Sequence, residues 1–388
     1  MKKLVVYDPK DDKIGQFRGG GRIIQILKEN FPEADFVNDL ISQSFWRVPT
    51  KSRDPSRISN LLIPTFNPFS SPLITNKLTT SKQLLIIYDV IPLKYPESFP
   101  AGIKGNFNLW RNKQALKNFD KIITISESSK KDIIRWLSVP EEKVMVIYPT
   151  LSNNFISTSV IARNPAQRGT KQSRPILTNF NQLQPILTKY CLYVGDVNWN
   201  KNLVNLAKAI KLTDIPCVFV GKPFSSETWN LKPETLIRDK ASSFRLQVSG
   251  LNHPWQQEFK QFLKEVGDDK RFIFLGYVED SALINLYQNA LCNVLVSHDE
   301  GFGLSYLEAS SQKCPSVMSD IPVFREIAGE STLFCDHLSP ASISENILKF
   351  LNSDLRRKIG EKAYKHIQRY SSENFRNNIL NVIARNET

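Results

Sequence analysis

Two glutamates flank a glycine-punctuated turn in the second half of the chain. Glu300 and Glu308 enclose residues 301–307, and the glycines at 301 and 303 lie in a predicted turn after an apolar run at 293–296. Glycines allow the backbone to approach a ligand closely, and a helix that begins near Leu304 offers free N–H groups that suit a diphosphate. Carboxylates beside such an anion site suit sugar hydroxyls. For an isolated pair, a helix cap with two solvated glutamates is the commoner explanation.

A lysine follows the apolar run 191–194, in the segment that begins at Gly195. Lys201 lies in a loop after a predicted strand, where its ammonium could neutralise a departing diphosphate. The alternative is an exposed loop lysine without a role in chemistry.

The first half carries weaker signals. Gly19, Gly20 and Gly21 form a predicted loop after the strand Leu4–Tyr7, and Arg22 opens the helix behind them. Such a triplet is also typical of a purely structural turn. Tyr88 and Asp89 end the apolar run 84–88, and a tyrosine there can instead cap a buried strand.

Short apolar runs that alternate with helical patterns must position these residues. The predicted strands are 4–7, 84–88, 121–126, 144–148, 191–194, 217–220, 272–275, 293–296 and 316–318. Strands separated by helices indicate βαβ units, and two such sets predict an α/β protein of two Rossmann-like, doubly wound parallel-sheet domains. We expect domains at 1–185 and 186–370, with ligands at the strand ends in a central cleft. Residues 151–186 resemble a basic linker loop, and 371–388 should form a terminal helix that packs back on the first domain.

Charge separates the two halves. The 388 residues carry a formal charge of +13, and residues 1–185 hold 27 basic and 15 acidic side chains, a net of +12. This excess predicts an anionic partner for the first half. Residues 99–121 interleave apolar and basic side chains, which favours an anionic membrane surface or a lipid-linked acceptor. The alternative is a solvated helix that packs Trp110 and Leu116 inward.

The sequence shows neither a signal-peptide pattern nor a transmembrane run. The five cysteines form no C-x-x-C pair, which is typical of buried, reduced thiols. We therefore expect a cytoplasmic protein, peripheral on the inner face of the cell membrane if the basic stretch binds lipid.

The ordered set of motifs resembles retaining glycosyltransferases of family 4, which have the GT-B fold and an E-x7-E motif. The segments that carry this resemblance are 19–22, 88–97, 120–132, 195–203, 274–290, 300–308 and 314–329. Two positions differ from the usual pattern. Tyr88 replaces a histidine, and Asp196 and Asn200 stand where the family usually has an arginine.

The resemblance implies a nucleotide diphospho-sugar held mainly by the second domain. Glu308 would bond the ribose, Glu300 the hydroxyls of the transferred sugar, and Lys201 the phosphate. Catalytic roles would fall to Glu300, Lys201 and Tyr88. The other implied substrate-binding positions are Gly20, Gly21, Arg22, Asp89, Gly195, Phe302, Gly303 and Leu304.

The expected reaction is metal-independent, retaining transfer of a hexose to a hydroxyl of a saccharide or lipid-linked acceptor in cell-surface polysaccharide synthesis. No cofactor, metal or nucleic acid is expected as a partner. Three alternatives stay open: a catalytically weak sugar-nucleotide-binding subunit of a glycosyltransferase complex, a sugar-nucleotide epimerase, and a nucleic-acid-binding protein that would account for the charge alone.

Overall fold

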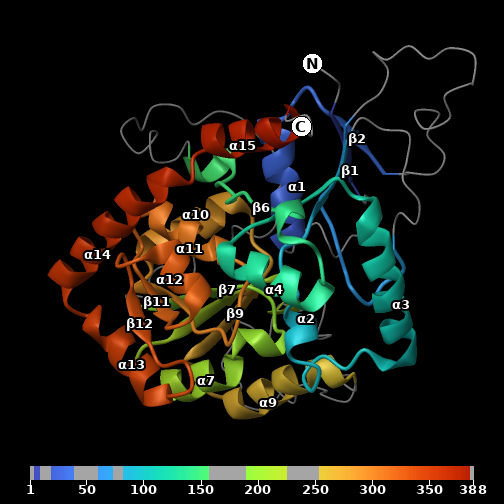
Figure 1. The fold of residues 1–388 in the computed structure, drawn as a ribbon. Coiled ribbons are helices and arrows are strands. Elements are labelled where there is room, and N and C mark those ends of the chain that lie inside the picture. The colour runs from blue at the N-terminus through green and yellow to red at the C-terminus, as the bar shows by residue number, and fades with distance from the viewer. Residues whose placement is uncertain are drawn as a thin grey trace, which may run out of the picture. The chain divides into compact units, whose positions relative to one another are not determined.

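The computed structural model describes residues 4–8, 19–38, 60–72, 82–156, 189–224 and 253–384. The chain divides into two compact units (Figure 1). Unit 1 comprises Met1–Thr150 with Tyr370–Thr388, and unit 2 comprises Leu151–Arg369. This division differs from the predicted one, because it places residues 151–156 with the second unit. There Phe155 is fully buried and lies edge-on against Tyr287, with ring centroids 6.4 Å apart. The predicted boundary at 185/186 lies outside the described residues, as does most of the predicted linker loop.

Unit 1 contains a six-stranded parallel sheet in the order β2-β1-β3-β4-β5-β6. Its strands are β1 (Leu4–Tyr7), β2 (Asp35–Val37), β3 (Asn60–Ile63), β4 (Lys82–Ile86), β5 (Lys121–Thr124) and β6 (Val144–Val146). Its helices are α1 (Gly19–Asn30), α2 (Ile91–Lys94), α3 (Gly102–Ala115), α4 (Glu127–Leu137) and α15 (Ser372–Ala384). The central strands β3 and β4 are almost entirely buried, which explains the apolar side chains at 61–63 and 84–86.

The terminal helix α15 is bonded to other parts of unit 1. Arg376 forms an ion pair of 2.6 Å with Glu33. Lys82 Nζ donates to the carbonyl of Val382 at 2.9 Å. These contacts join the last helix to segments 300 and 343 positions earlier in the chain.

Unit 2 repeats the plan, with the strand order β12-β11-β10-β7-β8-β9. Its strands are β7 (Cys191–Val194), β8 (Cys217–Val220), β9 (Phe272–Gly276), β10 (Cys292–Leu295), β11 (Ser316–Ser319) and β12 (Leu333–Cys335). Its helices are α7 (Leu203–Lys211), α9 (Gln257–Val266), α10 (Asp280–Asn289), α11 (Leu304–Ser311), α12 (Pro322–Ala328), α13 (Pro340–Lys349) and α14 (Ser353–His366).

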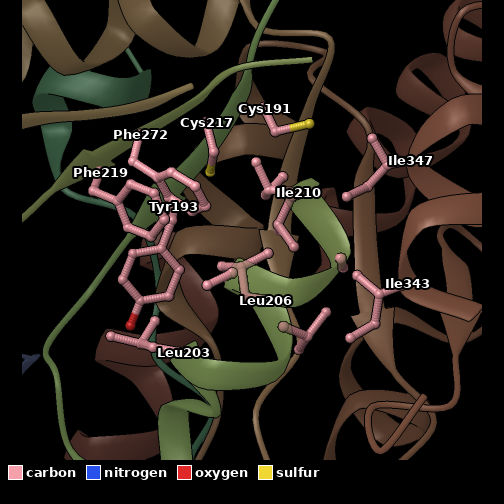
Figure 2. Packing of buried hydrophobic residues seen from close by; sticks show 14 of the residues in the cluster. Cys191, Tyr193, Leu203, Leu206, Ile210, Cys217, Phe219, Phe272, Ile343 and Ile347 are labelled. Atoms are coloured by element: carbon pink, nitrogen blue, oxygen red, sulfur yellow. The ribbon is translucent and has the colours of Figure 1, made fainter. Parts of the chain in front are cut away.

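The core of unit 2 forms where the central strands meet α7 and α13. Figure 2 shows Leu206 and Ile210 of α7 among side chains of β7, β8 and α13. All five cysteines are buried and free of disulfides, as the sequence predicted. None of the helices in the described residues is long and apolar enough to cross a membrane.

One expected loop is a helix instead. Gly19, Gly20 and Gly21 form the first turn of α1, so the helix begins three residues before the predicted start at Arg22. In this position their backbone N–H groups belong to a helix amino terminus, where the first N–H groups have no carbonyl partner within the helix.

Candidate functional site

Two loops of unit 2 meet at the carboxyl ends of its central strands. β7 and β10 are parallel neighbours, so the loops that follow them start side by side. Backbone and amide groups link the two loops. The N–H of His298 donates to the carbonyl of Asn200 at 2.8 Å, and Asn200 Nδ2 donates to the carbonyl of Asp299 at 3.0 Å. The two loops therefore form one bonded surface.

Lys201 and Glu300 pair across these loops. Lys201 Nζ lies 2.6 Å from Glu300 Oε1, and the two side chains are 20% and 12% exposed. The hydroxyl of Ser297 donates to the same carboxylate oxygen at 2.8 Å. An ammonium group and a carboxylate that face one position can serve both ends of a ligand, the cation a phosphate and the carboxylate a hydroxyl.

The turn after Glu300 leads into α11 through a left-handed glycine. Gly303 has φ of 106° and is the residue before the helix, and a Cβ at this position would lie 3.0 Å from Phe324 Cε1. Phe302 is buried, while Leu304 is half-buried at the helix start. The first N–H groups of α11 lack intrahelical partners and carry the positive end of the helix dipole.

Glu308 lies farther along α11 and is buried. Its Oε2 accepts a hydrogen bond of 3.2 Å from the hydroxyl of Tyr287 on α10. The hydrogen bond from Tyr287 fixes the orientation of the Glu308 carboxylate, so its remaining lone pairs are positioned to accept further hydrogen bonds.

Gly195 directly follows β7, at a point where space is tight. A Cβ there would lie 2.8 Å from the hydroxyl oxygen of Tyr193, which itself donates to the carbonyl of Asp196 at 2.5 Å. Asp196 Oδ1 in turn accepts from the N–H of Val197 at 2.8 Å. Asp196 therefore shapes the loop that carries Lys201, in place of the arginine that the sequence pattern leads one to expect.

Sequence reasoning missed an aromatic group beside the Lys201–Glu300 pair. Trp199 stacks on His298 with ring centroids 4.6 Å apart, and His298 meets His337 edge-on at 5.2 Å. Burial, together with the smaller effect of the neighbouring His337, lowers the pKa of His298 to about 4. Asn202, with φ of 56°, donates to the carbonyls of Val296 and His337. The sequence did offer one signal for this group: Trp199 and His298 each lie two positions before a predicted site residue, Lys201 and Glu300.

The expected site residues of unit 1 are bonded within that unit. The hydroxyl of Tyr88 donates to the carbonyl of Pro64, and burial raises its pKa above the usual value. Asp89 Oδ1 accepts from the N–H of Ile91 at 3.1 Å, at the start of α2. Arg22 Nη1 donates to Gln25 Oε1 at 3.1 Å on α1, where Gly20 and Gly21 occupy the first turn.

Metal ligands do not gather in the described parts of either unit, since no group of three or more His, Cys, Asp or Glu side chains there is arranged to hold an ion.

The two parallel sheets, each flanked by helices, define the class: this is an α/β protein of the GT-B type. HepE of Anabaena, solved in complex with UDP and glucose, superposes with a TM-score of 0.64 at 13% identity and covers 99% of this chain and 100% of its own. Sucrose-phosphate synthase from Thermosynechococcus elongatus gives a TM-score of 0.62 at 15% identity and covers 99% and 98%.

Within that class, residues 180–366 match the family model described as Glycosyl transferases group 1. O-antigen chain mannosyltransferase B of Escherichia coli is 28% identical over 271 residues, which are 69% of this chain and 61% of that protein. O-antigen chain mannosyltransferase RfbU of Salmonella typhimurium is 26% identical over 318 residues, 81% of this chain and 70% of that protein. The matched segment covers only 29% of the length of the mannosyltransferase WbdA of Escherichia coli, so that relative is much longer than the part that this chain matches.

Proposed function

We propose that this protein is a retaining, metal-independent glycosyltransferase. It moves a hexose from a nucleotide diphospho-sugar to a hydroxyl of a saccharide or lipid-linked acceptor. The names of the relatives as O-antigen mannosyltransferases support mannose as the hexose and cell-surface polysaccharide as the product.

The Lys201–Glu300 pair carries the proposal. Two strand-end loops bring an ammonium and a carboxylate to 2.6 Å beside the amino terminus of α11. In the proposed complex, Lys201 Nζ and the first N–H groups of α11, from Gly303 and Leu304, bind the diphosphate, and Glu300 accepts hydrogen bonds from the sugar. The buried carboxylate of Glu308 bonds the ribose hydroxyls, and the backbone of Phe302 and Gly195 borders the ligand.

The transfer follows from this charge distribution. The bond between the anomeric carbon and the β-phosphate oxygen breaks as the acceptor oxygen forms a new bond to that carbon on the same face. The acceptor proton passes to the departing phosphate. Positive charge on the sugar ring is stabilised by the carboxylate of Glu300, and negative charge on the phosphate by Lys201. The proposal assigns no protein nucleophile.

Residues of unit 1 have proposed supporting roles. The backbone of Gly20 and Gly21 and the guanidinium of Arg22 would bind the β-phosphate, since they lie in the first turn of α1. Tyr88 can still accept a hydrogen bond from the sugar through its hydroxyl oxygen while its proton is given to Pro64. Asp89 would hold this loop in position through its bond to Ile91.

A ligand panel tests the function. Thermal unfolding of the full chain is measured with GDP-mannose, UDP-glucose and UDP-N-acetylglucosamine, and sugar transfer to saccharide and lipid-linked acceptors is followed by NMR. A donor at a hundred times its Kd should stabilise unit 2 by about 2.7 kcal/mol. Retention predicts that the anomeric configuration of the donor survives in the product, and metal independence predicts undiminished turnover in EDTA.

Variants at the proposed site show whether the stabilisation by the donor arises there. Lys201→Ala and Glu300→Ala should both lose most of the stabilisation, whereas Lys270→Ala, at an exposed position of the same unit, should keep it. Absence of any response in the wild-type chain, or equal responses in all variants, would overturn the site assignment.

A catalytically weak sugar-nucleotide-binding subunit is the second candidate. The hydroxyl of Tyr88, which is bonded to a backbone carbonyl, favours it, because that proton is already engaged. Binding of a donor without transfer to any acceptor would support this candidate, and measured turnover by the purified chain would exclude it.

A further inference from the structure

Helix α3 of unit 1 packs in part through polar side chains, beside the buried Ala115 and the partly buried Leu109. Asn112 Nδ2 donates to the carbonyls of Pro68 and Ser70 at 3.0 and 2.8 Å, and Asn108 Nδ2 donates to that of Phe69 at 3.0 Å. Gly105 faces the same loop, since a Cβ there would lie 3.5 Å from Phe69 Cβ. The inward face of α3 is therefore anchored by amide hydrogen bonds, where a surface helix usually buries apolar side chains.

The outward face of α3 carries three exposed apolar side chains. Ile103 is 94% exposed, and Phe107 and Trp110 are each 58% exposed. Their spacing of four and three residues places all three on one side of the helix. The rings of Phe107 and Trp110 stack with centroids 6.0 Å apart. Of the two predicted inward side chains, Leu116 is buried as expected, but Trp110 is exposed.

Basic side chains border this apolar stripe on both sides. At about 100° per residue, Lys104 and Arg111 lie along one flank of the stripe, and Lys113 lies along the other. The helix contains no acidic residue, and residues 1–185 carry a net charge of +12. An apolar stripe flanked by cations is the pattern of a helix that lies in the interface of an anionic bilayer.

We propose that this face of α3 binds the surface of an anionic lipid bilayer. Ile103, Phe107 and Trp110 insert at the boundary between headgroups and acyl chains, while the basic side chains extend to the lipid phosphates. A second copy of the chain fits this face less well, because a symmetric contact would bring equal rows of cations together. The proposal stands independently of the proposed function.

Vesicle flotation of the full chain tests the proposal. Wild-type protein should bind phosphatidylcholine vesicles with about a third phosphatidylglycerol, bind pure phosphatidylcholine weakly, and release as salt rises. Phe107→Ser/Trp110→Ser should lower the partition coefficient about a hundredfold, because two large apolar side chains no longer enter the interface. Leu212→Ser/Leu338→Ser is the matched control, since these leucines of unit 2 are 59% and 64% exposed, and it should bind like wild type.

Two further variants separate charge from insertion. Lys104→Glu/Arg111→Glu should reduce binding to anionic vesicles about tenfold or more and remove most of its salt dependence. Trp110→Phe should bind like wild type but lose the part of the tryptophan quenching by brominated acyl chains that comes from position 110.

Four outcomes would overturn the proposal: no binding of the wild type to anionic vesicles, equal loss in the matched control, unchanged quenching in Trp110→Phe, or a change of oligomeric state in Phe107→Ser/Trp110→Ser with unchanged vesicle binding. The last outcome would assign the face to a protein contact. Thermal midpoints of all variants, with and without nucleotide sugar, verify folding and show whether the proposed function fails separately.

Discussion

The strand-end loops of the two units are built in different ways. In unit 2, side chains from the loops after β7 and β10 bond to each other, as Lys201 and Glu300 show. In unit 1, Tyr88 and Asp89 bond to backbone groups of their own surroundings. Side chains that bond to each other across two loops tolerate few substitutions, because a change in one leaves the other without its partner. A side chain that bonds only to a backbone group can be substituted without affecting another side chain. The family match at 180–366, which lies wholly in unit 2, agrees with this difference.

The outer surfaces differ as well. Unit 1 presents exposed apolar side chains of α3 bordered by cations. By halves of the sequence, residues 1–185 carry a net charge of +12, whereas residues 186–388, which include most of unit 2 and the last helix of unit 1, hold 24 basic and 23 acidic side chains. The two proposals together assign donor chemistry to unit 2, and contact with the acceptor and its membrane to unit 1. The predictions that follow test whether the chemistry is concentrated in unit 2.

The largest effect should come from the Lys201–Glu300 pair. Lys201→Ala removes the proposed charge on the departing phosphate, and we expect kcat to fall by about 10²–10³, the usual cost of losing one such electrostatic partner. Glu300→Ala should fall by a similar factor, and the double variant by less than the product, because the two side chains contact each other. Steady-state transfer rates measure all three, and a loss under fivefold in both single variants would place the chemistry elsewhere.

Gly303→Ala should give the next largest effect. An alanine there would be held at φ of 106° with its Cβ 3.0 Å from Phe324. We expect unit 2 to lose about 1–3 kcal/mol of stability and donor binding to weaken, because the start of α11 shifts.

Gly267→Ala is the matched control for Gly303→Ala. Gly267 has φ of 55°, but no heavy atom lies within 4 Å of its Cβ position. It should therefore show backbone strain without a clash and without loss of donor binding. Equal behaviour of the two variants in thermal unfolding and donor titration would contradict the role given to Gly303.

Much of the fold follows from the sequence, and the exceptions have a physical cause. The buried strands β1, β7 and β8 coincide with predicted apolar runs, since a strand covered on both faces needs them. The missed strands β2 and β12 are three residues long and lie at the sheet edges, where a half-buried strand leaves no such run. β3 was also missed, because its apolar run is only three residues long and follows Asn60.

The candidate site could be predicted only in part, for a related reason. Lys201 and Glu300 stand out as residues after strands, but their 2.6 Å pairing depends on β7 lying next to β10. Strand order is not encoded in local periodicity, so neither this pair nor the stacking of Trp199 on His298 was foreseen.

Lowering the pH should destabilise unit 2, because unfolding allows His298 to take up a proton. Burial holds its pKa at about 4 instead of 6.5, so unfolding takes up a proton between these values. Its contribution to stability is therefore complete above about pH 6.5 and is lost as the pH falls toward 4. His298→Phe keeps an aromatic ring against Trp199 but cannot take up a proton. Between pH 7.5 and 5, its free energy of unfolding should therefore fall by about 1 kcal/mol less than that of the wild type, a value already reduced because His298 is partly exposed. Thermal midpoints at both pH values measure it, and parallel curves for the two proteins would contradict it. His337, whose pKa burial also lowers, remains to titrate in both.

Tyr88→Phe should give the smallest effect and tests the comparison from the side of unit 1. The change removes the hydroxyl that donates to Pro64 and leaves that carbonyl to find water or another donor. We expect kcat/KM to fall by less than about fivefold, which matches the worth of one hydrogen bond of about 0.5–1 kcal/mol. Asp89→Asn is a useful companion, because an amide oxygen can still accept from Ile91 and should keep wild-type rates. A hundredfold loss in Tyr88→Phe alone would show that a hydroxyl of unit 1 takes a direct part in transfer. In that case, the chemistry would not be concentrated in unit 2.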